Sequence, residues 1–280
     1  MTMRSLSMEV DKVAAGKQRQ VADMVAVEEP LEVRLAWSTP KGRATRSISI
    51  TMRTPGNDYE LAAGFLYTEG IIGASSDIES IETCGPPAPD SGLHNVVRVE
   101  LQPHVSVDLG RLQRHFYTTS SCGVCGKTSL DALRVAGHES LATAATFSAS
   151  ALTSIPDQLR AAQDTFDATG GLHAAAVFSK DGQLGAVMED VGRHNAVDKV
   201  IGRLLLDDVL PASNSGMMVS GRASFELVQK TLVAGIPLLA AVSAPSSLAV
   251  SLAREFNMTL VGFLRGSTYN VYSAPQRLVS

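Results

Sequence analysis

Apolar and polar residues alternate along "PLEVRLAW" (30–37) and "TRSISITMRT" (45–54), on either side of the turn "STPKGRA". This period of two predicts a pair of β-strands. In "DYELAAGFLYTEGII" (58–72) apolar residues recur every three or four positions instead, which predicts a helix with Asp58 as its N-cap. Its expected buried stripe is Leu61, Phe65 and Leu66.

"NVVRVELQ" (95–102) reads as a further strand, so we expect a small α+β domain over residues 29–113. Residues 1–28 are polar, carry scattered charges and lack helical apolar periodicity. They are expected to form a flexible N-terminal tail.

The second half of the chain has a different pattern, in which predicted helices alternate with short, uniformly apolar strands. A hairpin signal, Lys180-Asp181-Gly182, joins the first two strands. The helix over 195–208 carries Val197, Val200, Ile201, Leu204 and Leu205 on one face. The expected helices are 130–137, 155–166 (ending at Gly170-Gly171), 195–208, 224–235 and 246–257, and the expected strands are 172–179, 183–190, 216–220, 237–243 and 258–264.

This order predicts an α/β fold for residues 114–280. Uniformly apolar strands between helices pair in parallel under helices on both faces, and the hairpin adds antiparallel strands. The result is a three-layer α/β/α sandwich around a mixed sheet. Ligands of such sheets bind at the carboxyl ends of the strands. Here those ends lead into Glu189–Asn195, Ser220–Ser224, Ser243–Ser247 and Arg265–Thr268.

Composition narrows the possible partners. The net charge of −4 argues against a nucleic-acid-binding surface. The N-terminus has no apolar segment typical of a secretory signal. The segment from Thr231 to Ala253 has no charged residue, but Gly235, Pro237 and Pro245 interrupt it, so we expect no membrane span and a cytoplasmic protein.

The loop "TTSSCGVCGKTS" (118–129) contains Cys122 and Cys125 in a C-x-x-C spacing. A predicted helix start nearby and Lys127 favour the thiolate form, and therefore a reactive sulfur. A structural thiol pair is the alternative. Zinc is disfavoured because only Cys84 remains as a third cysteine and no histidine motif accompanies it. Thioredoxin-like exchange is disfavoured because the approach to the loop is polar rather than strand-like.

The segment "EDVGRHNAVDK" (189–199) crowds six polar groups at a predicted strand end, among them Arg193 and His194. Such a helix N-terminus suits an anionic ligand, and His194 suits proton transfer near neutral pH. The alternative is structural, with Asp190 capping the helix and Arg193 paired to it. Arg222 and Arg265 follow two other strands, which together suggests a phosphate-bearing ligand. No P-loop or dinucleotide-binding motif is present.

Together these motifs resemble the formate dehydrogenase accessory sulfurtransferase family (FdhD). The resemblance covers about residues 30–275, in matching order. The segments that carry it are "YELAAGFLYTEGII" (59–72), "TSSCGVCGK" (119–127), "EDVGRHNAVDKVIG" (189–202), "SGRASFELVQK" (220–230), "GIPLLAAVSAPSSLAV" (235–250) and "LVGFLRGSTYNVYS" (260–273).

The resemblance implies a cytoplasmic sulfurtransferase that takes persulfide sulfur from a cysteine desulfurase. We expect no structural metal and no nucleic-acid partner. It implies transfer of that sulfur to the bis-molybdopterin guanine dinucleotide cofactor of formate dehydrogenase, bound as substrate. Cys122 matches the persulfide-bearing cysteine and Cys125 its partner. The cofactor-binding stretch falls on Phe263, Leu264, Arg265, Gly266, Ser267 and Thr268, to which the strand-end analysis adds Arg193, His194 and Arg222.

The resemblance also implies a homodimer and a cytidine-deaminase-like fold for the second half. The zinc ligands of true deaminases are missing, since "GRHNAVD" and "SGRAS" stand in their places. Two other functions stay open: a chaperone that binds the molybdenum cofactor while its cysteines serve docking or redox sensing, and a zinc enzyme related to deaminases.

Overall fold

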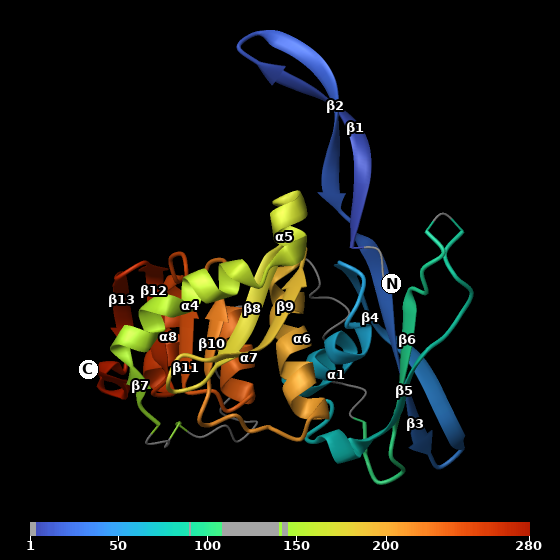
Figure 1. Cartoon of the computed structure of the whole chain (residues 1–280). Helices are drawn as coiled ribbons and strands as arrows, with labels where there is room; N and C mark the ends of the chain where they lie inside the picture. The colour runs from blue at the N-terminus through green and yellow to red at the C-terminus, as the bar shows by residue number, and fades with distance from the viewer. Residues whose placement is uncertain (1–3, 90, 108–139, 142–144) are drawn as a thin grey trace.

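The computed structural model describes residues 4–89, 91–107, 140–141 and 145–280. Its class is mixed α/β, as predicted, with two main sheets that come from different parts of the chain (Figure 1). The expected domain boundary near residue 113, the C-x-x-C loop and the helix expected at 130–137 lie outside the described residues.

The first sheet has four strands in the order β4-β3-β6-β5, with β3 and β6 parallel and the outer pairs antiparallel. Helix α1 covers one face, where Leu61 and Leu66 are buried and Phe65 is half-buried, as predicted. Strand β5 was missed because its apolar positions are few. The elements are β3 (Glu29–Thr39), β4 (Gly42–Arg53), α1 (Asp58–Thr68), β5 (Ile78–Thr83) and β6 (Val96–Leu101).

The predicted N-cap of α1 is wrong by one residue. Asn57 holds the cap position, with a positive φ of 57° and no side-chain capping bond. Asp58 instead forms two hydrogen bonds of 3.0 Å with the guanidinium of Arg53, a side chain that is only 1% exposed. A charge buried this deeply requires an ionic partner, and this requirement outweighs capping.

The second sheet has six strands in the order β13-β12-β11-β10-β8-β9. β10, β11 and β12 run parallel, and the β8–β9 hairpin joins them in antiparallel fashion through β8. The predicted strands and their mixed pairing are confirmed, and β13 is an additional edge strand. The strands are β8 (His173–Phe178), β9 (Leu184–Asp190), β10 (Gly216–Val219), β11 (Leu238–Ala241), β12 (Thr259–Arg265) and β13 (Thr268–Ser273).

Helices cover both faces of this sheet, which confirms the three-layer arrangement. Alternate strand residues point to opposite faces: Met217 packs with α6, α7 and α8, whereas Met218 packs with α4. Each such apolar side chain stabilises the fold by about 1.5–3 kcal/mol through burial. The helices are α4 (Ala149–Ala161), α5 (Asp164–Thr169), α6 (Arg193–Leu206), α7 (Phe225–Val233) and α8 (Ser247–Glu255).

The helix expected over 155–166 is in fact two helices. α4 begins earlier, where the Ser148 side chain accepts a 3.2 Å hydrogen bond from the backbone N–H of Ala151. α5 follows after a break and ends at Gly170, whose φ of 67° provides the left-handed C-terminal cap. Short strands β7 (Phe147–Ser148) and β14 (Leu278–Val279) pair in parallel beside α4.

The first 28 residues, expected to be a flexible tail, contain a β-hairpin. Strands β1 (Ser5–Ala14) and β2 (Lys17–Ala26) pair along their whole length and extend away from the rest of the chain (Figure 1). The two turn residues, Ala15 and Gly16, both have positive φ, the geometry that suits a tight hairpin. The strand pattern was missed because charged residues interrupt its alternation.

Helices α1 and α6 join the two sheets at a close crossing. A Cβ added to Gly64 would lie 1.9 Å from the carbonyl oxygen of Asp198, and one added to Gly202 would lie 1.8 Å from that of Glu60. Only hydrogen atoms fit at these two positions. The crossing therefore depends on both glycines.

Candidate functional site

Four strands of the six-stranded sheet end at the same edge. β9, β10, β11 and β12 all run in one direction, and β8 runs in the opposite direction between β9 and β10. The carboxyl ends of the four strands and the start of β8 therefore line this edge, as the sequence predicted for the strand-end segments. We call it the site edge.

Arg193 and His194 are the first two residues of α6 and are both half-buried at the site edge. The Nε2 atom of His194 lies 3.4 Å from the Ser224 hydroxyl and 3.8 Å from a carboxylate oxygen of Glu226. The neighbouring His194 imidazole lowers the pKa of Glu226 to about 2, so this carboxylate stays ionised near neutral pH. An imidazole held beside a fixed negative charge is suited to proton transfer.

His173, which the sequence analysis did not single out, belongs to the same cluster. It starts β8, and a Cβ added to Gly221 would lie 3.4 Å from its Nδ1 atom. Burial, followed by the positive charges of Arg193 and His194, lowers the pKa of His173 below its ordinary value of 6.5. The sequence could have indicated this position, because β8 was predicted to be antiparallel. The first residue of an antiparallel strand lies at the edge where the neighbouring strands end.

The guanidinium of Arg193 has unused hydrogen-bonding capacity. Its Nε atom is buried and has no hydrogen-bonding partner in the described part of the chain. The alternative in which Arg193 pairs with Asp190 is wrong, because Asp190 pairs with Lys199 at 2.7 Å. Arg193 is therefore available to an anionic ligand, and Arg222, two strand positions away, is exposed at the same edge.

The other polar residues of "EDVGRHNAVDK" are internal rather than part of an open site. Asp190 accepts hydrogen bonds from the backbone N–H groups of Gly192 and Thr54 and from the Asn195 amide. Lys199 also donates to the carbonyl oxygen of Thr54, at 2.9 Å. These bonds hold the end of β4 against the start of α6 and thereby fix the position of Arg193 and His194.

Two further members of these motifs form a second buried pair. The ammonium of Lys230 lies 2.9 Å and 3.0 Å from the carboxylate oxygens of Asp198 and donates to Thr68 at 2.8 Å. Glu189 is likewise buried and accepts hydrogen bonds from the first backbone N–H groups of α5. Asp198 and Glu189 are therefore not available to a ligand.

The predicted cofactor-binding stretch forms the end of β12 and the turn into β13. Phe263 is 41% exposed, has a φ of 54° and donates its backbone N–H to the carbonyl oxygen of Ser243. Arg265 is exposed, and its Nε donates to the carbonyl oxygen of Val242 at 3.2 Å. Leu264 is fully buried, backbone included, so it supports the turn from below rather than facing solvent. Gly266, Ser267 and Thr268 are exposed.

The predicted residues thus lie along the same edge of the sheet but are not all close to one another. Four strand spacings separate β12 from β9, which at about 4.8 Å each places the 263–268 turn about 19 Å from the end of β9. Arg193, His194 and His173 lie at one end of the row, Arg222 lies between, and Phe263–Thr268 lie at the other end. The row suits an extended ligand better than a small one.

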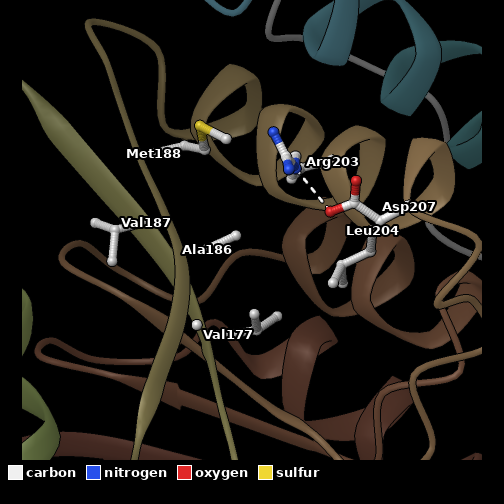
Figure 2. Close-up of a pocket in the computed structure, with 8 residues that line it drawn as sticks. Val177, Ala186, Val187, Met188, Arg203, Leu204 and Asp207 are labelled. Atoms are coloured by element: carbon white, nitrogen blue, oxygen red, sulfur yellow. Dashed lines mark hydrogen bonds and ion pairs between the residues drawn. The ribbon is translucent and has the colours of Figure 1, made fainter.

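The site edge is separate from a shallow hollow of about 380 Å³ between β9 and α6 (Figure 2). The hollow lies toward the opposite end of β9 and is mostly apolar, with the Arg203–Asp207 ion pair of 2.7 Å at its rim. The described residues offer no cluster of His, Cys, Asp and Glu side chains that would hold a metal ion. Cys84 is half-buried and unbridged, whereas Cys122 and Cys125 lie outside the described residues.

No helix in the described part of the chain has the length and apolar character that a membrane span requires.

Comparisons with known proteins identify relatives along almost the whole chain. A family model described as the FdhD/NarQ family matches residues 26–279. Three curated relatives carry the name sulfur carrier protein FdhD. They come from Streptomyces coelicolor (52% identity, 91% of this chain and 89% of the relative), Mycolicibacterium paratuberculosis (52%, 96% and 97%) and Saccharolobus solfataricus (43%, 92% and 91%).

A solved structure has the same fold. It belongs to a candidate formate dehydrogenase accessory protein from Desulfotalea psychrophila, with a TM-score of 0.76 and 24% identity over 99% of this chain and 100% of that one. At this level of identity the likeness concerns the fold alone.

Proposed function

The chain belongs to the FdhD/NarQ family, and we propose that it carries sulfur for the maturation of a formate dehydrogenase. The observation that carries the proposal is the match, at about half identity and over more than nine-tenths of the chain, to proteins named sulfur carriers. A C-x-x-C pair in "SCGVCGK" supplies the sulfur chemistry that such a role needs.

The proposed transfer has two balanced steps. The Cys122 thiolate attacks the outer sulfur of a persulfide on a cysteine desulfurase, forming Cys122–S–SH and releasing the donor's thiolate. In the second step the acceptor supplies the electron pair that bonds to the terminal sulfur, the S–S bond of the persulfide breaks, and Cys122 leaves as its thiolate. Cys125 either accepts the sulfur in turn or attacks the inner sulfur of the persulfide, which releases hydrosulfide and leaves a disulfide.

The proposed acceptor is the bis-molybdopterin guanine dinucleotide cofactor, bound as substrate before it enters the catalytic subunit of formate dehydrogenase. The site edge supports this choice because its arginines form an extended row. Arg193 and Arg222 would hold phosphate oxygens through forked donors, and the 263–268 turn would hold the far end. His194, kept beside ionised Glu226, would give or take a proton at the reacting sulfur.

Persulfide mapping tests the sulfur step. The purified protein is loaded with sulfur by a cysteine desulfurase and cysteine. Each persulfide adds one sulfur atom, about 32 Da, which is located by peptide mass spectrometry. We expect the label on the 119–127 peptide of the wild type, its loss in Cys122→Ala and its retention in Cys84→Ala. Cys125→Ala then separates the roles of the two cysteines.

A Cys122→Ala protein labelled as well as the wild type would refute the assignment. If a Cys122→Ala/Cys125→Ala protein still yields active formate dehydrogenase, the cofactor-binding chaperone function replaces sulfur transfer.

A further inference from the structure

The hairpin formed by β1 and β2 lies almost entirely outside the region that the family model matches, which starts at Ala26. It extends from the body of the molecule as a two-stranded ribbon, and only its base is anchored (Figure 1). There Arg4 donates to the Asn57 side chain at 2.8 Å, and Ala26 packs near Gly171. Isolated two-stranded ribbons are only marginally stable in water, so this one requires a covering partner.

The ribbon exposes both backbone edges and apolar side chains. Leu6 is 46% exposed, Met8 50% and Val13 67%. Open strand edges of this kind pair readily with a strand of another chain. The question is which edge pairs and with what.

The sequence of β2 is complementary to itself when it is read in the opposite direction. In an antiparallel pair of β2 strands related by a two-fold axis through Val21, Arg19 of each copy lies opposite Asp23 of the other. Val21 then faces Val21, and Lys17 faces Val25, so no like charges oppose one another. This register also uses nearly the whole strand. Each opposite-charge pair across neighbouring strands contributes about 0.2–1 kcal/mol.

β1 lacks this property. The two antiparallel self-pairings that use nearly its whole length have their two-fold axis at Glu9 or at Val10. The first places Glu9 opposite Glu9, and the second places Glu9 opposite Asp11 twice. Like charges directly opposite each other destabilise a strand pair. The charges therefore select the β2 edge.

We propose that β2 pairs with β2 of a second copy of this chain, giving a four-stranded antiparallel sheet in the order β1-β2-β2-β1 with Val21 on the two-fold axis. The inference deepens the expectation of a homodimer by naming its interface, and it does not depend on sulfur transfer. Because Ala26 lies near Gly171, two residues before His173, the joined ribbons leave each copy beside its site edge.

A charge exchange tests the interface in the full-length protein by sedimentation velocity over a concentration series. Arg19→Asp and Asp23→Arg each create two like-charge pairs, and we expect each to weaken dimerisation about tenfold or more, which equals about 1.4 kcal/mol. The double variant Arg19→Asp/Asp23→Arg restores opposite charges and should restore dimerisation to the wild-type level. Persulfide loading, measured in parallel, stays unchanged, because these residues lie outside the proposed sulfur site.

Cross-linking provides a direct measure of proximity that does not depend on any other contact between copies. In a background with the three native cysteines changed to serine, Val21→Cys should form a disulfide between copies under mild oxidation, since directly opposed Cβ atoms lie about 4.5–5.5 Å apart. Val13→Cys on the outer edge is the matched control and should not. A monomeric wild type, a double variant that fails to recover, or equal cross-linking at both positions would each overturn the proposal.

Discussion

At the residue scale, the pKa of His173 depends on the burial and the charges at the site edge. Its imidazole is half-buried and lies near the guanidinium of Arg193, so its neutral form is favoured in the folded chain. The unfolded chain binds the proton more tightly. The contribution of His173 to stability is therefore greatest above pH 6.5 and decreases as the pH falls through the folded-state pKa.

Replacing this cation tests the cluster. In Arg193→Gln the pKa of His173 should rise toward 6.5, because a positive charge is removed while the burial of the ring is retained. Imidazole resonances followed by NMR across a pH titration measure this directly. Arg254→Gln, a change at an exposed arginine of α8, serves as the control and should leave the titration unchanged. An unchanged His173 titration in Arg193→Gln would show that burial alone sets its pKa.

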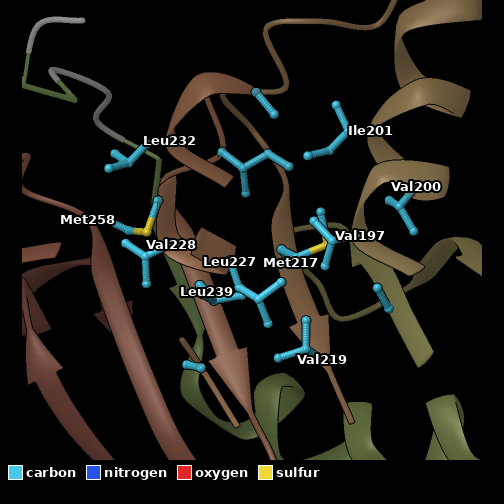
Figure 3. Packing of buried hydrophobic residues seen from close by; sticks show 14 of the residues in the cluster. Val197, Val200, Ile201, Met217, Val219, Leu227, Val228, Leu232, Leu239 and Met258 are labelled. Atoms are coloured by element: carbon cyan, nitrogen blue, oxygen red, sulfur yellow. The ribbon is translucent and has the colours of Figure 1, made fainter. Parts of the chain in front are cut away.

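At the element scale, α6 organises the molecule. One face of this helix packs into the large apolar cluster beneath β10 and β11, where Val197, Val200 and Ile201 contact side chains of the sheet and of α7 (Figure 3). Another face crosses α1 at Gly64 and Gly202, and its first turn presents Arg193 and His194. The geometry of the site edge therefore depends on how closely α1 and α6 approach.

Adding one methyl group at the crossing tests this dependence. Gly64→Ala would place a Cβ 1.9 Å from the carbonyl oxygen of Asp198, so the helices must separate, at a cost of about 1–3 kcal/mol. Urea denaturation should show a lower midpoint. Gly73→Ala is the matched control, because the nearest atom to its added Cβ lies 3.6 Å away, and its midpoint should stay close to that of the wild type. Equal midpoints for Gly64→Ala and the wild type would contradict the close crossing.

At the scale of the whole molecule, the site edge is a row rather than a pocket. About 19 Å separates its two ends. If a ligand is held at both ends of the row, a substitution at one end should reduce its binding free energy independently of a substitution at the other end. Side chains this far apart share no contacts. A small ligand would meet only one end.

Paired substitutions distinguish these cases. Arg193→Gln and Arg265→Gln should each weaken binding of the molybdenum cofactor, and the double variant should show the sum of the two free-energy losses. Calorimetric titration with guanosine diphosphate, which carries only the guanine end of the cofactor, should respond to one substitution and not to the other. If neither substitution changes binding of the intact cofactor, the ligand lies elsewhere.

The local elements and the residues that form the site edge could be predicted from the sequence alone. Period-two and period-3.6 apolar patterns specify which segments bury a face, and this is enough to place β8 to β12 and the helices between them. The strand ends then locate Arg193, His194, Arg222 and Arg265–Thr268, whereas Phe263 and Leu264 are implied by the family resemblance. The same patterns failed at β1 and β2, where charged residues interrupt the alternation, and at β5, where apolar positions are few.

Only the tertiary structure decided which polar groups face solvent. Within "EDVGRHNAVDK" the sequence could not separate Arg193 and His194 from Asp190, Asn195 and Lys199, because all five are equally polar as residues. Burial separates them. The ion pair of Asp190 with Lys199, at 2.7 Å, is buried together with Thr54, which follows β4 and is far away in sequence. His173 joins the site for the same reason, since its place depends on the antiparallel direction of β8 within the folded sheet.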